Sequence, residues 1–211
     1  MKKIFLVFTL ILFTSCGMNN QVVNKSPDSS VELTFKVNDG SPYYSIKKNN
    51  KIIVDESLLG LILKNNLDFT NDLKIKSISS SSHSSKWSPT FGEEKNILNE
   101  YNKMKVLLSK DSLEILLLFK IFNDGVAFKY DVPNQKNIIS YDIIDEKTEF
   151  NLSSDDKAWW IPAFSYRRYE FLHAFSSVDS ISKKYFSEKV EDITYDSLGI
   201  DAAHTPFTLK K

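Results

Sequence analysis

The chain has 211 residues, enough for one domain with a substantial core, and 42% of them are hydrophobic. Its 27 lysines and arginines balance its 27 aspartates and glutamates, so the composition gives no reason to expect nucleic acid or another strongly charged partner. A neutral ligand is compatible with this balance. Cys16 is the only cysteine, which excludes a disulfide framework and a thiolate zinc site from the rest of the chain.

The first residues have the features of an export signal. A basic Met1-Lys2-Lys3 start precedes a continuous apolar run from Ile4 to Phe13, which is too short to span a bilayer as a helix. Thr14 and Ser15 place small residues before Cys16, which resembles a bacterial lipobox, where the cysteine carries lipid. The alternative is an ordinary cleaved signal with an incidental cysteine. We predict a lipoprotein-type signal peptide over residues 1–16, lipidation of Cys16, and a lipid-anchored chain in the cell envelope, periplasmic or associated with the outer membrane.

Residues 17–30 are polar and lack an apolar period, so we expect them to form a tether between the lipid and the domain. Strand patterns begin with Val31–Val37, where apolar and polar residues alternate, and Asn38-Asp39-Gly40 supplies a turn. Further strands are expected at Tyr43–Lys47, Ile52–Val54, Leu58–Leu63, Leu73–Ile78, Lys103–Leu108, Leu113–Phe122, Val126–Tyr130, Ile138–Ile144 and Thr148–Leu152.

For two segments the secondary structure is less obvious from the pattern. Leu113–Phe122 is apolar enough for a buried helix, but Asn123-Asp124-Gly125 after it is a hairpin signal, which favours a central strand. Ser79–Ser85 is rich in serine, and we expect a flexible loop with a solvated His83. Many strands with few helical periods predict an all-β fold, a large β-sandwich.

Several motifs occur in one order along the chain. They are Trp87–Met104, Phe122–Tyr130, Ala158-Trp159-Trp160-Ile161-Pro162, Tyr169-Glu170-Phe171 and Ala203-His204-Thr205-Pro206. This set resembles the N-terminal domain of glycoside hydrolase family 97, from about Val31 to the last residue. Several ordered motifs together are more specific than any one of them.

The resemblance implies a β-supersandwich of the galactose-mutarotase type over residues 31–211. In complete members this domain packs against a (β/α)8 barrel, and the enzymes are calcium-dependent α-glucosidases or α-galactosidases, many of them from bacteria that degrade glycans in the periplasm. Phe207–Leu209 looks like a strand near the end of the sequence, so we expect the supersandwich to be incomplete at its C-terminus and truncated before the barrel. The family's catalytic carboxylates belong to the barrel, and we assign no catalytic residue here.

The resemblance also implies candidate site residues. Glu170 matches the glutamate that the family's N-terminal domain contributes to calcium, an ion that takes six to eight oxygens. One ligand does not make a site, so calcium is expected in the complete enzyme and no cofactor in this chain alone. The alternative is a surface ion pair of Glu170 with Arg167 or Arg168.

Three residues are candidates for contact with a substrate. Trp160 could stack on a sugar ring, with core packing equally open, whereas we expect Trp159 to be buried because neighbours on a strand face opposite ways. Arg167 offers a fork of donors that lysine cannot supply. His204 could hydrogen-bond a sugar hydroxyl or be a satisfied histidine at a strand start.

Three functions therefore compete. The first is the carbohydrate-associated N-terminal domain of an α-glycosidase, not hydrolytic alone, whose partners are an oligosaccharide or α-glycoside and a barrel in the same or another chain. The second is a free-standing lipid-anchored carbohydrate-binding module. The third is a structural or interaction lipoprotein with no affinity for sugar.

Overall fold

The computed structural model describes residues 20–65, 67–136, 138, 140–163, 171–182 and 202–211. These residues form strands and one short 3₁₀ turn, which confirms the predicted all-β class. The strands are β1 (Gln21–Lys25), β2 (Val31–Asn38), β3 (Ser41–Lys48), β4 (Lys51–Leu58), β5 (Leu61–Leu63), β6 (Leu67–Asp68), β7 (Lys74–Trp87), β8 (Ile97–Lys110), β9 (Leu113–Ile121), β10 (Val126–Asp131), β11 (Ile143–Glu146), β12 (Lys157–Trp160), β13 (Ala174–Ser177) and β14 (Thr208–Lys210), with the 3₁₀ turn at Val178–Ser180. No helix in the described part of the chain is both long and apolar enough to cross a membrane.

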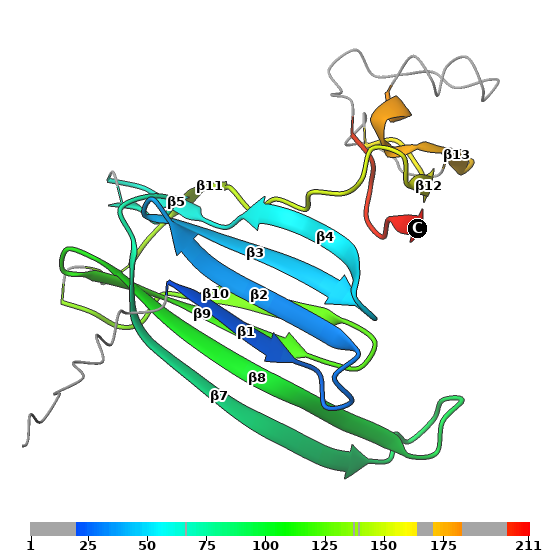
Figure 1. Cartoon of the computed structure of the whole chain (residues 1–211), viewed down its shortest axis with the longest axis horizontal. Helices are drawn as coiled ribbons and strands as arrows, with labels where there is room; N and C mark the ends of the chain where they lie inside the picture. Colours follow the sequence, from blue (N-terminus) through cyan, green and yellow to red (C-terminus); the bar gives the residue numbers. More distant parts are fainter. Residues whose placement is uncertain (1–19, 66, 137, 139, 164–170, 183–201) are drawn as a thin grey trace, which may run out of the picture.

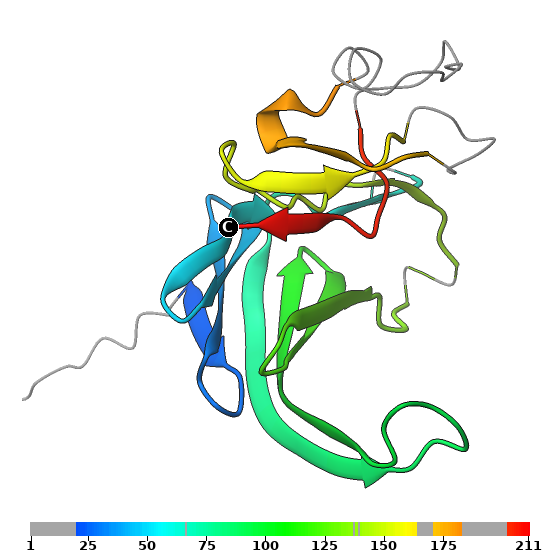
Figure 2. The same ribbon diagram turned by 90° about the vertical axis from the view of Figure 1, so that its right-hand side faces the viewer.

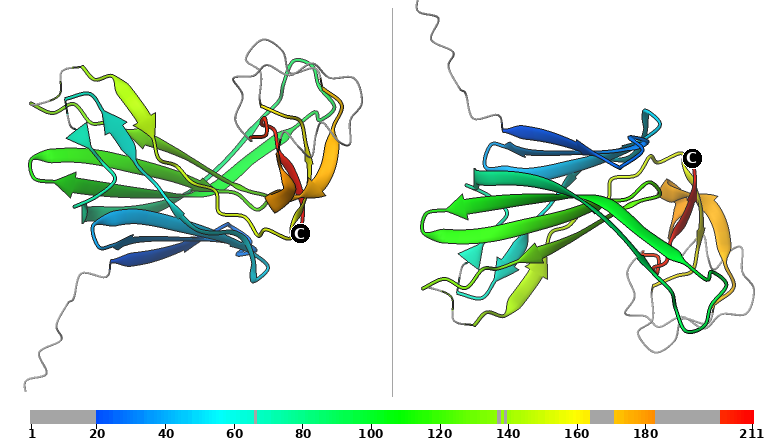
Figure 3. Two further views of the ribbon diagram at one scale, coloured as in Figure 1. Left: turned by 90° about the horizontal axis from the view of Figure 1, so that it is seen from above. Right: turned by 90° about the horizontal axis from the view of Figure 1, so that it is seen from below.

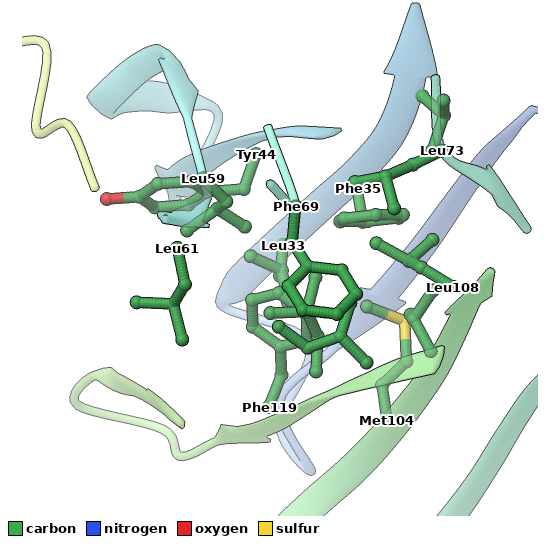
Figure 4. Close-up of a cluster of buried hydrophobic side chains, with 14 of the residues drawn as sticks. Leu33, Phe35, Tyr44, Leu59, Leu61, Phe69, Leu73, Met104, Leu108 and Phe119 are labelled. Atoms are coloured by element: carbon green, nitrogen blue, oxygen red, sulfur yellow. The ribbon is translucent and has the colours of Figure 1, made fainter. Parts of the chain in front are cut away.

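Two four-stranded antiparallel sheets face each other, in the orders β1-β2-β3-β4 and β10-β9-β8-β7 (Figure 1). Alternate residues of β2, β8 and β9 point between the sheets, so a period of two in the sequence becomes one apolar layer. Leu33 and Phe35 from β2 meet Met104 from β8 and Phe119 from β9 in this layer (Figure 4). The rings of Phe35 and Phe119 lie 6.0 Å apart across it.

Leu113–Ile121 forms β9, with β8 on one side and β10 on the other. The prediction of a central strand over a buried helix is confirmed. The Asn123-Asp124-Gly125 segment joins β9 to β10, and the amide of Phe122 donates a 2.8 Å hydrogen bond to the carbonyl of Gly125.

A tight turn at Asp39 and Gly40 joins β2 to β3, and both residues have positive φ, at 49° and 80°. Asp-Gly suits such a turn because glycine adopts positive φ without a steric penalty. The carbonyl of Gly40 also accepts a 2.8 Å hydrogen bond from the amide of Leu73. A Cβ at Gly40 would lie 2.6 Å from the backbone nitrogen of Asp72, so both conformation and space require glycine here.

The hairpin of β7 and β8 differs from the loop that the sequence predicts at Ser79–Ser85. Ser79–Ser85 is part of β7, a strand of 14 residues that pairs with β8 along its whole length. The predicted flexible loop is therefore wrong, although the segment is exposed as expected. His83 is not simply solvated, because its ring stacks on Tyr101 with centroids 4.8 Å apart. The end of this hairpin extends beyond the sandwich (Figure 2).

The prediction that residues 17–30 form a polar tether is also partly wrong. Gln21–Lys25 forms β1 and pairs with β2, and the side chain of Ser26 accepts a hydrogen bond from the amide of Val31. The domain therefore starts about ten residues earlier than the alternation alone indicates. Other bounds differ as well: β4 and β5 divide the expected strand Leu58–Leu63, and residues 148–152 form no strand.

Two small sheets complete the fold. One has the order β11-β5-β6 and closes one end of the sandwich, and the other has the order β13-β12-β14 and carries its own apolar cluster around Trp160 (Figure 3). The Nζ of Lys211 contacts the carbonyl of Ile52 at 3.3 Å and the carboxylate of Asp156 at 2.8 Å. These contacts connect the end of β14 to β4 and to the segment before β12.

Candidate functional site

The small sheet of β12, β13 and β14 brings the tryptophan motif and the histidine motif together. Strand β12 lies in the middle, with Trp159 opposite Phe175 of β13 and opposite Thr208 of β14. Beyond the strand, Pro162 forms a bridge with Ala203. The amide of His204 donates a 2.9 Å hydrogen bond to the carbonyl of Ile161. Two motifs far apart in the sequence are thus neighbours.

Trp160 is completely buried in this sheet's own core. Its indole Nε1 donates a 3.0 Å hydrogen bond to Ser176 Oγ, and Ala158 and Ala174 are buried with it. A buried indole needs such a polar partner. Since none of its surface is accessible, the structure contradicts the expectation that Trp160 stacks on a sugar.

Trp159 has the opposite orientation, and the expectation that it is buried is wrong as well. Its side chain is 40% exposed and that of Phe175 is 47% exposed. Their ring centroids lie 4.5 Å apart with an angle of 37° between the planes. We call these two residues the aromatic pair. Rings of this kind can cover the apolar C–H face of a pyranose, so the pair, rather than Trp160, is the candidate sugar contact in the described residues.

His204 is half-buried, and its Nε2 lies below the surface. Its position beside Ile161 is set by the backbone hydrogen bond described above. This bond holds the backbone of His204 next to Ile161, the residue that follows β12. Whether it contacts a sugar hydroxyl stays a prediction.

Three other candidates, Arg167, Glu170 and Cys16, lie outside the described residues, as does Arg168. Among the described residues, no group of three or more histidine, cysteine, aspartate or glutamate side chains could hold a metal ion. Glu170 as a calcium ligand stays a prediction.

Hydrogen bonds from Ser177 and Ser180 lower the pKa of Asp179, in the 3₁₀ turn after β13, whereas two tyrosines with raised pKa values lie in the sandwich. Burial raises the pKa of Tyr44, whose hydroxyl donates to the carbonyl of Glu149 at 2.8 Å. Burial also raises the pKa of Tyr130, against the effect of its hydrogen bonds with Thr148 and Gly60. Both tyrosines hold the segment after β11 against the sandwich, so these shifts belong to structure rather than to a reactive site.

Phe175 is the residue that the sequence did not indicate. It lies in Ala174–Ser177, a strand of four residues with only two apolar side chains. Such a short stretch has no measurable period. Its importance is visible only once β13 is paired with β12.

The sequence matches known proteins of one kind. The profile of the family "Glycosyl-hydrolase 97 N-terminal" matches residues 25–211. A retaining alpha-galactosidase of Bacteroides thetaiotaomicron is 24% identical over 157 residues, which are 74% of this chain and 22% of that protein.

Similar structures agree with this match. A glycoside hydrolase family 97 enzyme of Pseudoalteromonas sp. strain K8, solved with panose, superposes with a TM-score of 0.76 and 28% identity, over 90% of this chain and 26% of the enzyme. The same scores describe that enzyme solved with acarbose. A beta-arabinopyranosidase has a TM-score of 0.64 and 26% identity, over 68% of this chain and 23% of its own.

This chain spans about a quarter of the length of the enzymes that it matches. Its paired four-stranded sheets agree with the β-sandwich expected from the motifs. The match extends from the last residue of β1 through β14 and includes the sheet that carries the aromatic pair. The chain belongs to the family of N-terminal domains of glycosyl hydrolase family 97.

Proposed function

We propose that this chain is the carbohydrate-associated N-terminal domain of a family 97 α-glycosidase of the α-glucosidase or α-galactosidase type. The observation that carries the proposal is the match over residues 25–211 to a domain found in glycoside hydrolases. One relative is a retaining alpha-galactosidase, and a similar enzyme was solved with panose and with acarbose. Panose and acarbose are saccharides, which supports an oligosaccharide or α-glycoside as the ligand.

Hydrolysis by this chain alone is not part of the proposal. Cleavage of a glycosidic bond needs two carboxyl groups at a separation of roughly 5 to 9.5 Å, one to protonate the leaving oxygen and one to attack or to activate water. The resemblance assigns both to a (β/α)8 barrel and neither to any residue here. We propose that a barrel, in the same or another polypeptide, supplies them.

The aromatic pair is the proposed sugar contact, with Arg167 and His204 as donors to sugar hydroxyls. Glu170 is the proposed calcium ligand that this domain gives to the shared site. Tyr169-Glu170-Phe171 leads directly into the segment before β13, the strand that carries Phe175. The test of Glu170 as a ligand is the calcium affinity of the assembled enzyme with Glu170→Gln.

We further propose that Cys16 carries lipid and anchors the chain in the cell envelope. The supporting observation is the small-residue sequence before Cys16, after an apolar run. Metabolic labelling with a fatty acid in a bacterial host tests this. Label that is lost in Cys16→Ser supports the anchor, and a cleaved but unlabelled chain would favour the ordinary signal peptide.

The main experiment is calorimetric titration of the full chain with panose and with an α-galactoside, in parallel for Trp159→Ala and Trp87→Ala. Trp87 is the matched control because it is another exposed tryptophan, 53% accessible, on the β7–β8 hairpin. We expect binding that Trp159→Ala weakens roughly two- to tenfold, since loss of a ring contact costs about 0.5–1.5 kcal/mol. Equal affinity in Trp159→Ala, or an equal loss in Trp87→Ala, would refute the role of the aromatic pair.

The alternative is a free-standing, lipid-anchored carbohydrate-binding module. The exposed aromatic pair favours it, because the pair is accessible in this chain alone. Mixing the chain with the barrel portion of a family 97 enzyme distinguishes the two. A complex seen by gel filtration, with calcium-dependent activity that falls in Glu170→Gln, supports the domain of a larger enzyme. Sugar binding without any complex supports the module.

A further inference from the structure

The outer face of the sheet β10-β9-β8 carries a group of lysines. Leu117, Phe119 and Ile121 of β9 point into the core, so Leu118 and Lys120 point outward. The register extends this alternation to both neighbours. One row across the sheet is Ser81, Lys103, Lys120 and Ala127, and the next row is Ser79, Lys105, Leu118 and Lys129. We call Lys103, Lys105, Lys120 and Lys129 the lysine face.

The lysine face has little compensation from carboxylates. Lys103 and Lys120 lie directly opposite each other, and like charges in such a pair repel. Within the described residues, neither of them nor Lys105 forms an ion pair with an acidic side chain, and Lys129 has only Asp131, at 3.9 Å. Lys120 instead lies 4.5 Å from the ring centroid of Tyr101. An anion bound between the rows would relieve this repulsion.

The lysines surround a shallow hollow of about 520 Å³. Leu118 and Ala127 lie between the charged side chains, and Tyr101 borders the hollow. This size is within the range of about 300 to 1,000 Å³ that is usual for pockets that bind small ligands. The view from below shows β8 and β9 on the open side of the molecule, away from β1–β4 (Figure 3).

We propose that the lysine face binds an acidic oligosaccharide whose sugar rings carry carboxylates. Ammonium groups spaced along two rows suit carboxylates on successive sugars, and the apolar residues between them suit C–H faces of the rings. Ser79 and Ser81 add hydroxyls at one end of each row. The chain has no net charge, so this local excess of positive charge marks one surface rather than the whole protein. The choice of a saccharide rests on the proposed function, but the residues lie on a different sheet from the aromatic pair.

The test is calorimetric titration of the full chain with a hexamer of galacturonic acid, with maltohexaose as the uncharged probe. We expect the acidic hexamer to bind to the wild-type chain. The double variant Lys103→Gln/Lys120→Gln is expected to weaken this binding roughly tenfold, and so is an increase of the salt concentration from about 50 to 300 mM. The control Lys48→Gln/Lys51→Gln removes the same charge from another cross-strand lysine pair, at the β3–β4 turn outside the hollow. It is expected to bind like the wild type.

Each other outcome refutes the proposal. No binding of the acidic hexamer by a folded chain refutes the site, and an equal loss in the control variant refutes its location. Maltohexaose bound equally at the same lysines refutes the role of charge. Polyglutamate of the same length bound as tightly refutes the saccharide in favour of an acidic peptide. Failure here leaves the panose titration and its Trp159→Ala variant unaffected, so the two proposals can fail separately.

Discussion

The indole Nε1 of Trp160 and the hydroxyl of Ser176 lie 3.0 Å apart and join β12 to β13 inside the smaller of the two apolar clusters of the described residues. Because Trp160 points inward, Trp159 must point outward, next to Phe175. A single buried hydrogen bond thus helps decide which aromatic rings are presented to solvent.

Ser176→Ala is expected to lower the free energy of unfolding by about 1–3 kcal/mol, since it removes this acceptor from a buried indole N–H. Urea unfolding followed by tryptophan fluorescence measures the change. Ser154→Ala is a control of the same chemistry, because Ser154 is exposed in the segment before β12. Equal stability of Ser176→Ala and wild type would contradict a structural role for the bond.

Gly40→Ala is expected to be strongly destabilising. It places a Cβ 2.6 Å from the backbone nitrogen of Asp72 and demands a φ of +80° from alanine. Both the steric clash and the positive φ act in the same direction, and together they are expected to cost about 2 kcal/mol or more.

Gly125→Ala is the matched control, because no atom lies within 4 Å of the Cβ that would be added there. It is expected to leave the midpoint of urea unfolding almost unchanged. Similar losses in both variants would mean that space at the turn does not determine the requirement for glycine.

The strands of the sandwich could be predicted because their core-facing positions alternate with a period of two, as in Val31, Leu33, Phe35 and Val37. The same rule failed where neither face is buried. Ser79–Ser85 has no apolar alternation, since the β7–β8 hairpin continues beyond the core there. Its strand is held by backbone pairing with β8, which composition does not reveal.

The candidate site could be predicted only in part. The tryptophan and histidine motifs were found, and the structure brings them together at Ile161 and His204. The tryptophan that faces the core was predicted wrongly, because two adjacent residues of the same type fit either register. The choice depends on Ser176, a partner that is distant in sequence and has no motif of its own.

Asp68 is expected to make the free energy of unfolding depend on pH in the acidic range. Burial acts to raise its pKa, but hydrogen bonds from Thr70 and Asn71 outweigh this and hold the pKa below its usual value of 3.8. A carboxyl group with a lowered pKa stabilises the fold above the pKa of the unfolded state, and that contribution is lost as pH falls through the folded pKa. Asp68→Asn is therefore expected to lose stability at pH 7 and to show a flatter fall below about pH 4.

Unfolding by urea at a series of pH values measures this dependence. Asp124→Asn, at the exposed β9–β10 turn, changes the same charge and is expected to follow the wild-type profile. If the profile of Asp68→Asn ran parallel to that of the wild type, the three-residue hydrogen-bond cluster would have no role in acid stability.

Tyr44 is expected to make the free energy of unfolding fall as the pH rises in the alkaline range. It is 1% exposed, and burial raises its pKa above the ordinary value of 10.0. The contribution of such a group is complete below the unfolded pKa and is lost as pH rises towards the folded one, at about 1.4 kcal/mol per pH unit. Tyr44→Phe is expected to cost about 1 kcal/mol at pH 7, from the lost bond to Glu149, and to flatten the decline above pH about 10.

Tyr141→Phe provides the control for Tyr44, since Tyr141 is 46% exposed. It is expected to leave both the stability at pH 7 and the alkaline decline unchanged. Should Tyr44→Phe keep the full wild-type decline, the buried hydroxyl would not be responsible for it.

Lys103→Glu tests the repulsion on the lysine face without any ligand. It converts a like-charged cross-strand pair with Lys120 into an opposite pair, and such a change is worth about 0.2–1 kcal/mol. We expect higher stability at low salt and a smaller gain at high salt, because screening weakens exposed charge pairs. Binding of the galacturonic acid hexamer is expected to fall in the same variant. A variant that is more stable yet binds the hexamer less well would agree with the proposed role of the lysine face, whereas unchanged binding of the hexamer would contradict it.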